Sequence, residues 1–112
     1  MHTQYRVNTE DAKILRRRAG SYLRGLRTDA GLTQQQVAKA LGWDYYTMVS
    51  QIERGISRLP PEDMASYATT LGVDLAKMAK DLLEFYDPHM HAAMFGDVGQ
   101  IKFAGSELKT AI

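Results

Sequence analysis

Apolar residues recur at every third or fourth position along most of the chain, which is the spacing of one face of an α-helix. The first stripe consists of Leu15, Ala19, Tyr22, Leu23 and Leu26. Asn8 or Thr9 can cap this helix, and the sequence Asp29-Ala30-Gly31 ends it. Gly20 and Gly25 each disfavour a helix interior by about 1 kcal/mol relative to alanine. The helix therefore depends on tertiary packing, or it kinks near Gly20-Ser21.

A second, shorter pattern predicts a helix that begins after Thr33. Gln36 follows Thr33 by three residues, so the two side chains can form a capping box. Val37, Ala38 and Leu41 form the apolar stripe of this helix. Gly42 ends it, as a left-handed C-terminal residue would.

After the turn at Trp43-Asp44, the pattern predicts another helix from about Tyr45 to Arg54, ending at Gly55. Val49 and Ile52 are three residues apart and are expected to face inward. The remaining side chains are aromatic or form hydrogen bonds, with no core-facing period. A short helix with such a face suits the major groove of DNA.

Three further helices follow in the carboxyl-terminal half. Pro60-Pro61 suits a helix start, and the inner face of this fourth helix is Met64, Ala68 and Leu71. Asp74 is expected to cap a fifth helix, and Asp87-Pro88 to begin a sixth over residues 89–95. The fifth helix should turn five residues inward: Leu75, Met78, Ala79, Leu82 and Phe85. Ile101 and Phe103 alternate with polar residues, which is a weak strand signal.

The pattern as a whole predicts an all-α fold. We expect an arm over residues 1–8, a five-helix domain over 9–86 and an extension with a sixth helix over 87–112. A chain of 112 residues can bury one modest core. The extension carries much apolar surface, so it either folds back on the fourth and fifth helices or covers a second subunit. We favour the second reading, which makes the extension a dimerisation element.

Composition narrows the possible functions. The chain has no cysteine, which excludes disulfides and thiolate chemistry. No apolar run approaches the roughly 20 residues that cross a bilayer, and no signal peptide is visible. These features favour a cytoplasmic location.

No nucleophile motif or glycine-rich phosphate loop is present in the sequence. His89 and His91 lie on different faces of a helix, so they do not form a metal pair. We expect no enzyme activity, no metal and no cofactor.

Charge is unevenly distributed although the net charge is only +1. Residues 1–60 carry ten basic and five acidic side chains, a balance of +5. Residues 61–112 carry four basic and eight acidic side chains, a balance of −4. A polyanion is therefore attracted to the half that contains the two short helices.

The segments TQQQVAKALG and TMVSQIERG, separated by a short turn, resemble the helix-turn-helix of the Cro and phage-repressor family, the lambda-repressor-like or XRE regulators of bacteria and phages. The resemblance continues through RLPPEDMASYATTLGVDLAKM and covers roughly Leu15 to Leu83. It implies a five-helix DNA-binding domain. The chain departs from the family pattern by one additional residue between Gly42 and Ile52, which we place in the turn near Trp43-Asp44.

The resemblance and the polar face of the second short helix together define a candidate site. The expected base contacts are Tyr45, Tyr46, Thr47, Ser50 and Gln51; Gln51 can pair in bidentate fashion with adenine. One of the two tyrosines could instead belong to the core. The expected phosphate contacts are Thr33, Gln34, Gln35, Arg54, Ser57 and Arg58. The resemblance also implies a structural ion pair between Arg27 and Glu53.

These features predict a transcriptional regulator, in particular a repressor, at the nucleoid. It would bind double-stranded DNA in a sequence-specific manner, as a homodimer on an inverted repeat. The alternative is a protein-interaction module that uses the helix-turn-helix as a scaffold. In that case the extension or the acidic helices would bind a partner protein, as antitoxins bind toxins.

Overall fold

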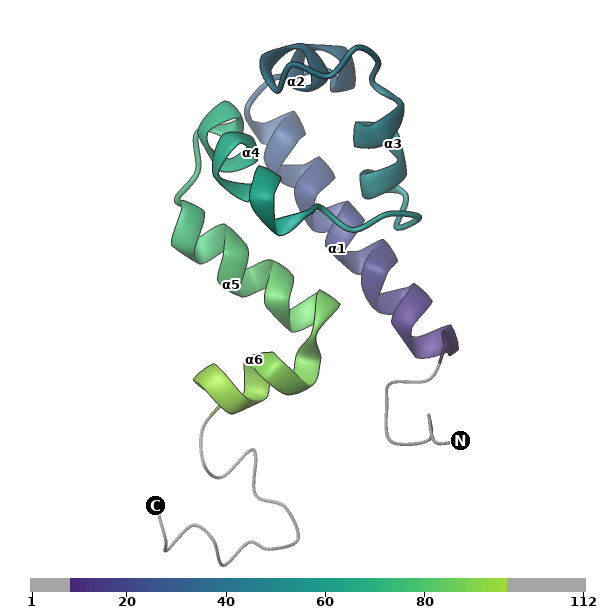
Figure 1. The fold of residues 1–112 in the computed structure, drawn as a ribbon, viewed down its shortest axis with the longest axis vertical. Helices are drawn as coiled ribbons and strands as arrows, with labels where there is room; N and C mark the ends of the chain where they lie inside the picture. Colours follow the sequence, from purple (N-terminus) through teal and green to yellow (C-terminus); the bar gives the residue numbers. More distant parts are fainter. Residues whose placement is uncertain (1–8, 97–112) are drawn as a thin grey trace, which may run out of the picture.

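The computed structural model describes residues 9–96, which form six α-helices, one 3-10 turn and no strand (Figure 1). The expected arm over residues 1–8 and the strand signal at Ile101 and Phe103 lie outside the described residues. The all-α prediction is confirmed. The elements, in chain order, are α1 (Thr9–Asp29), α2 (Gln34–Ala40), α3 (Thr47–Glu53), η2 (Pro61–Asp63), α4 (Met64–Leu71), α5 (Leu75–Tyr86) and α6 (Pro88–Phe95).

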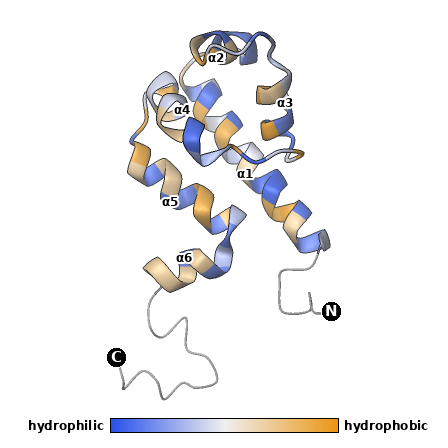
Figure 2. Cartoon of the chain, viewed as in Figure 1, coloured by the Kyte–Doolittle hydropathy of each residue, from blue (hydrophilic) through white to orange (hydrophobic). Residues whose placement is uncertain are grey.

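The long helix α1 is the centre of the arrangement, since it packs against α3 on one side and α5 on the other (Figure 1). Helix α2 packs against α3 and α4, α4 also packs against α5, and α6 packs on the end of α5. Hydrophobic and hydrophilic segments alternate along α1 and α5 (Figure 2), as expected for helices with one buried face. The alternative of a kink at Gly20-Ser21 is wrong, because α1 runs straight and unbroken through both residues.

The core consists largely of the residues that the periodicity placed inward. Ten of these are buried: Ala19, Leu23, Val37, Ala38, Val49, Ile52, Ala68, Leu71, Met78 and Leu82. Leu75 was expected to face inward but is 42% exposed. It is the first residue of α5, where the helix has not yet reached the core. Tyr67 and Leu59 are fully buried although no periodic stripe included them.

Helix ends follow the capping signals. The Asp74 carboxylate accepts a hydrogen bond of 2.8 Å from the backbone N–H of Lys77, so the expected cap of α5 is confirmed. Helix α6 begins at Pro88, one residue before the expected start. The Asp87 side chain makes no capping bond to it, because its carboxylate pairs with Arg58 instead.

Gly20 explains how α3 comes close to α1. Gly20 is buried, and a methyl group added to its Cα would lie 2.6 Å from the carbonyl carbon of Glu53 and 2.7 Å from the carbonyl oxygen of Ile52. Both of these atoms belong to the backbone at the end of α3 and cannot move aside cheaply. The glycine that weakens α1 as an isolated helix is therefore what allows the two helices to touch.

We expect Gly20→Ala to lower the free energy of unfolding by about 1–3 kcal/mol, since the added methyl group forces α1 and α3 apart. Gly25→Ala is the matched control. It lies in the same helix with no atom within 4 Å of an added Cβ, so it should raise the stability by about 0.5–1 kcal/mol. Urea unfolding followed by circular dichroism measures both values. Equal effects of the two substitutions would show that Gly20 is not a contact point.

Candidate nucleic-acid interface

Helix α2 is held at both ends by the residues that the sequence analysis singled out. The backbone N–H of Gln36 donates to the Thr33 hydroxyl at 3.1 Å, and the Thr33 N–H donates to the Gln36 side-chain oxygen at 2.8 Å. This is the expected capping box. At the other end Gly42 has a φ of +78°, and the Trp43 N–H donates to the Ala38 carbonyl oxygen at 2.9 Å. The chain therefore leaves α2 through a sharp left-handed turn.

The connection between α2 and α3 is longer than expected. Helix α3 begins at Thr47, not at Tyr45, so both tyrosines precede it. The first helical bond runs from the Ser50 N–H to the Tyr46 carbonyl oxygen at 3.0 Å. Tyr46 already has helical dihedral angles, and no side chain caps the helix. The segment from Gly42 to Tyr46 thus precedes α3, and the buried face of the helix is formed by Val49 and Ile52.

Neither tyrosine belongs to the core. Tyr45 is 77% exposed and Tyr46 46% exposed, so the alternative that one of them is buried is wrong. Trp43 fills the place beneath the connection. Its ring is half-buried and lies 6.4 Å, centroid to centroid, from the ring of the buried Tyr67.

Helix α3 has one buried apolar face and one outward polar face, as its sequence pattern predicted. Val49 and Ile52 are fully buried. On the outward side, Thr47 is exposed and Ser50 and Gln51 are half-buried. Among residues 9–96, no side-chain hydrogen bond or ion pair engages these three polar side chains. Met48 was not among the expected site residues, but it is 39% exposed and lies with Tyr45 and Gln51 around one hollow of about 460 Å³.

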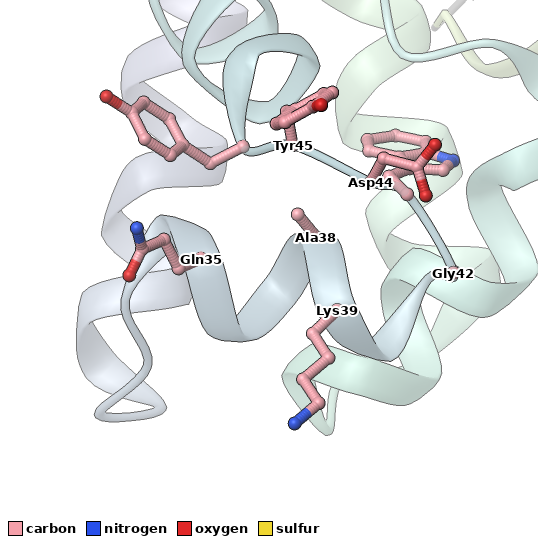
Figure 3. Close-up of a pocket in the computed structure, with 8 residues that line it drawn as sticks. Gln35, Ala38, Lys39, Gly42, Asp44 and Tyr45 are labelled. Atoms are coloured by element: carbon pink, nitrogen blue, oxygen red, sulfur yellow. The ribbon is translucent and has the colours of Figure 1, made fainter.

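A second hollow of about 510 Å³ lies on the α2 side of the connection. Gln35, Ala38 and Lys39 of α2 form one wall, and Asp44 and Tyr45 form the other (Figure 3). The exposed Tyr45 therefore stands between two depressions, one shared with α2 and one with α3. This surface is uneven, with a projecting aromatic ring, and its polar groups come from both helices.

Behind this surface, Glu53 at the end of α3 organises three elements. The Arg27 guanidinium donates to both carboxylate oxygens of Glu53, at 2.7 Å and 3.0 Å, so the pair is bidentate. A third Arg27 nitrogen donates to the Leu32 carbonyl oxygen at 2.8 Å. The Gln34 side-chain amide donates to Glu53 at 3.0 Å. Helix α1, the start of α2 and the end of α3 are thereby fixed to one carboxylate.

The environment of this carboxylate affects the ionisation of its neighbours. The hydrogen bond to Glu53 raises the pKa of Arg27 above its usual value, although desolvation acts in the opposite direction. Burial raises the pKa of Tyr67, and the negative charge of Glu53 adds to the effect. Both groups therefore keep their protons throughout the physiological range. Tyr67 is thus a neutral phenol, and its hydroxyl has no hydrogen-bond partner within residues 9–96.

Some of the residues that were expected to contact phosphates have side chains that are already engaged within the protein. Gln35 and Arg54 are exposed, and Ser57 is half-buried. Thr33 and Gln34 are engaged through their side chains, in the capping box and with Glu53 respectively. Arg58 donates to Asp87 at 2.8 Å and lies over the Tyr86 ring at 4.6 Å. A phosphate contact by Arg58 would have to compete with Asp87.

No group of three acidic, histidine or cysteine side chains that could hold a metal ion occurs in the described part of the chain. No helix among these residues is long and apolar enough to cross a membrane.

We expect Glu53→Ala to lower the free energy of unfolding by about 3 kcal/mol. The substitution leaves the Arg27 charge partly buried without its partner, and Arg27 and Glu53 are only 11% and 3% exposed. The control is Lys77→Ala, which removes an ion pair to Asp81 in which the lysine is 73% exposed; this change should stay below about 1 kcal/mol. Chemical denaturation followed by Trp43 fluorescence measures both. Similar losses in the two variants would argue against a special role for the Glu53 cluster.

Residues 15–80 match the helix-turn-helix domain family. No curated protein gave a match. The matched range covers more than half of the 112 residues and contains the whole of α2 and α3. With its capped α2, its left-handed turn and its exposed α3, the chain belongs to the helix-turn-helix domain family, whose fold indicates DNA binding.

Proposed function

We propose that this protein is a sequence-specific regulator of transcription that binds double-stranded DNA as a dimer. Helix α3 would enter the major groove, and the regulator would act as a repressor by occupying an inverted repeat. A helix lies in the major groove with its side chains against the base edges. Base contacts would come from Tyr45, Tyr46, Thr47, Ser50 and Gln51.

The observation that carries this proposal is the row of unpartnered polar groups on a firmly anchored helix. Val49 and Ile52 are fully buried, and Glu53 is fixed by Arg27 and Gln34. The outward groups make no polar contact among residues 9–96. An ordered backbone with uncommitted donors and acceptors favours a partner that offers a matching pattern, as base edges do.

Contacts to phosphates would fix the position of α3 in the groove. Gln35 on α2 and Arg54 directly after α3 are exposed, and Ser57 follows in the chain. Gln34 can offer its backbone N–H group at the start of α2, where the helix dipole favours an anion, whereas the Thr33 N–H would first have to leave Gln36. Arg58 would join them only by giving up or sharing Asp87.

The distribution of charge along the chain also supports DNA binding through the half that contains α3. The half that carries α3 has a balance of +5 and the other half one of −4. DNA is thus attracted to one end of the molecule and repelled from the other. Because bound phosphates release counterions, affinity should fall steeply as salt rises.

We propose a dimer because one short helix can contact only a few bases. Two copies related by a two-fold axis double the contact set and read an inverted repeat, with half-site centres about 34 Å apart or a multiple of that. We propose the C-terminal extension as the pairing element, in particular Met90, which is 54% exposed on α6. The extension would also be the surface used in the alternative function, binding of a partner protein.

The decisive experiment is selection of bound fragments from a random pool of DNA duplexes at two salt concentrations. Recovery of one inverted-repeat sequence at both concentrations supports the regulator. Salt-sensitive retention without any preferred sequence contradicts it and favours the protein-interaction alternative.

We expect Gln51→Ala to relax sequence preference at one base position of each half-site and to weaken specific binding by about 1–3 kcal/mol, because a bidentate pair to a base is lost. Repeating the selection with the variant measures the first effect, and titration of the selected duplex measures the second.

Arg54→Ala is the contrasting variant. It should weaken binding to all sequences evenly and reduce the slope of log affinity against log salt by about one, since it removes one phosphate contact. An unchanged preferred sequence for Gln51→Ala would show that Gln51 does not read a base.

We expect Met90→Glu to shift the protein from dimer to monomer, since it places a charge in the proposed apolar contact. His89→Glu adds the same charge at the neighbouring exposed position of α6 and should leave the dimer intact. Sedimentation equilibrium gives the masses. An unchanged mass for Met90→Glu would move the pairing surface away from α6.

A further inference from the structure

The segment that follows α3 is anchored both to α3 and to the end of α5. The Ser57 N–H donates to the Gln51 carbonyl oxygen of α3 at 3.2 Å. Leu59 is fully buried, and its N–H donates to the Tyr86 hydroxyl of α5 at 3.1 Å. Arg58 lies between these two anchors. Its backbone is therefore held close to the carboxyl end of α3, where a DNA backbone would pass in the proposed complex.

Asp87 holds the Arg58 side chain at the junction where α5 ends and α6 turns away from it (Figure 1). The carboxylate accepts a hydrogen bond of 2.8 Å from the guanidinium, whose carbon lies 4.6 Å from the centre of the Tyr86 ring. The Arg58 and Asp87 side chains are 44% and 45% exposed. An ion pair with this exposure is weak, so another anion can take the place of the carboxylate. A DNA phosphate is such an anion.

The Asp87 carboxylate has a second possible partner in α6. Asp87 is the residue that precedes this helix, Pro88 is its first residue, and the first helical bond runs from the His91 N–H to the Asp87 carbonyl oxygen at 3.0 Å. The N–H groups of His89 and Met90 therefore lack an intrahelical acceptor. An aspartate at this position ordinarily accepts a hydrogen bond from one of them. The Asp87 side chain makes no such bond while it pairs with Arg58.

We infer that Asp87 occupies the place of a DNA phosphate on Arg58, and that DNA binding releases Asp87 to cap α6. In the free protein the carboxylate weakens binding to DNA of any sequence, because Arg58 must first give it up. In the complex Arg58 contacts the phosphate, and the released carboxylate stabilises the helix that carries the proposed pairing residue Met90. DNA binding and the stability of α6 are then coupled in both directions. This inference rests on the proposed function, since it places Arg58 against DNA.

Asp87→Asn tests the first half, because it removes the charge that holds Arg58 and keeps the size of the side chain. We expect it to raise the affinity for a labelled duplex of arbitrary sequence about two- to fivefold. The slope of log affinity against log salt should steepen by up to about 0.9, the contribution of one phosphate contact. Glu84→Gln is the matched control. It removes the same charge from an exposed position of α5 that does not pair with Arg58, so it should have a smaller effect and leave the slope unchanged.

Fluorescence anisotropy at a series of salt concentrations measures both quantities. In a chain that also carries Arg58→Ala, Asp87→Asn should have no more effect than Glu84→Gln. Equal effects of the two substitutions in a chain that retains Arg58 and binds the duplex would overturn this inference alone. No binding of the duplex by the unaltered chain would overturn the proposed function together with it.

Exchange of the His89 and Met90 amide protons with water, followed by NMR, tests the second half. Arg58→Ala leaves Asp87 free to cap α6, so we expect one of these amides to exchange about fivefold more slowly in this variant than in the unaltered chain, without any DNA. Addition of Asp87→Ala to Arg58→Ala should restore the fast exchange. In the unaltered chain, the duplex should produce the same slowing. Fast exchange in Arg58→Ala would overturn the inference.

Discussion

The bidentate pair between Arg27 and Glu53 is the interaction on which the rest of the structure depends. It lies where α1, the start of α2 and the end of α3 meet, and Gln34 adds the third connection to the same carboxylate. The Glu53 side chain is only 3% exposed. A buried carboxylate is stable only when its partners are close and well oriented, so the cluster tolerates little movement of any of the three helices.

The close packing around Glu53 matters because α3 is too short to be stable alone. It has seven residues and no side-chain cap at its start, whereas isolated helices below about 12–15 residues are marginal in water. Its conformation therefore comes from its surroundings. Val49 and Ile52 anchor one face, Glu53 fixes the end, and Gly20 allows α1 to approach the backbone closely. The polar side chains on the opposite face contribute little to folding and are available for a ligand.

Sequence reasoning predicted most of the fold because the local signals agreed with one another. Helical periodicity identified the buried residues of α1, α2 and α3, and the capping signals at Thr33, Gly42 and Asp74 marked helix ends that the structure contains. The prediction from sequence was incomplete where tertiary packing decides which residues are buried or paired. Tyr67 is buried against Trp43 although tyrosine is ambiguous in a pattern. The helix start at Thr47 was missed because nothing in Asp44-Tyr45-Tyr46 signals a cap. Pairing of Arg58 with Asp87, 29 residues away, could not be read from spacing.

The connection of Trp43 to Tyr46 has a consequence for how this scaffold can diversify. Only Trp43 is packed against the core, while Asp44, Tyr45 and Tyr46 are exposed. The side chains at these three exposed positions can therefore change without altering the packing of the core. A family built on this framework can acquire new binding preferences by exchanging a loop of a few residues, and a protein engineer could graft such loops without redesigning the interior.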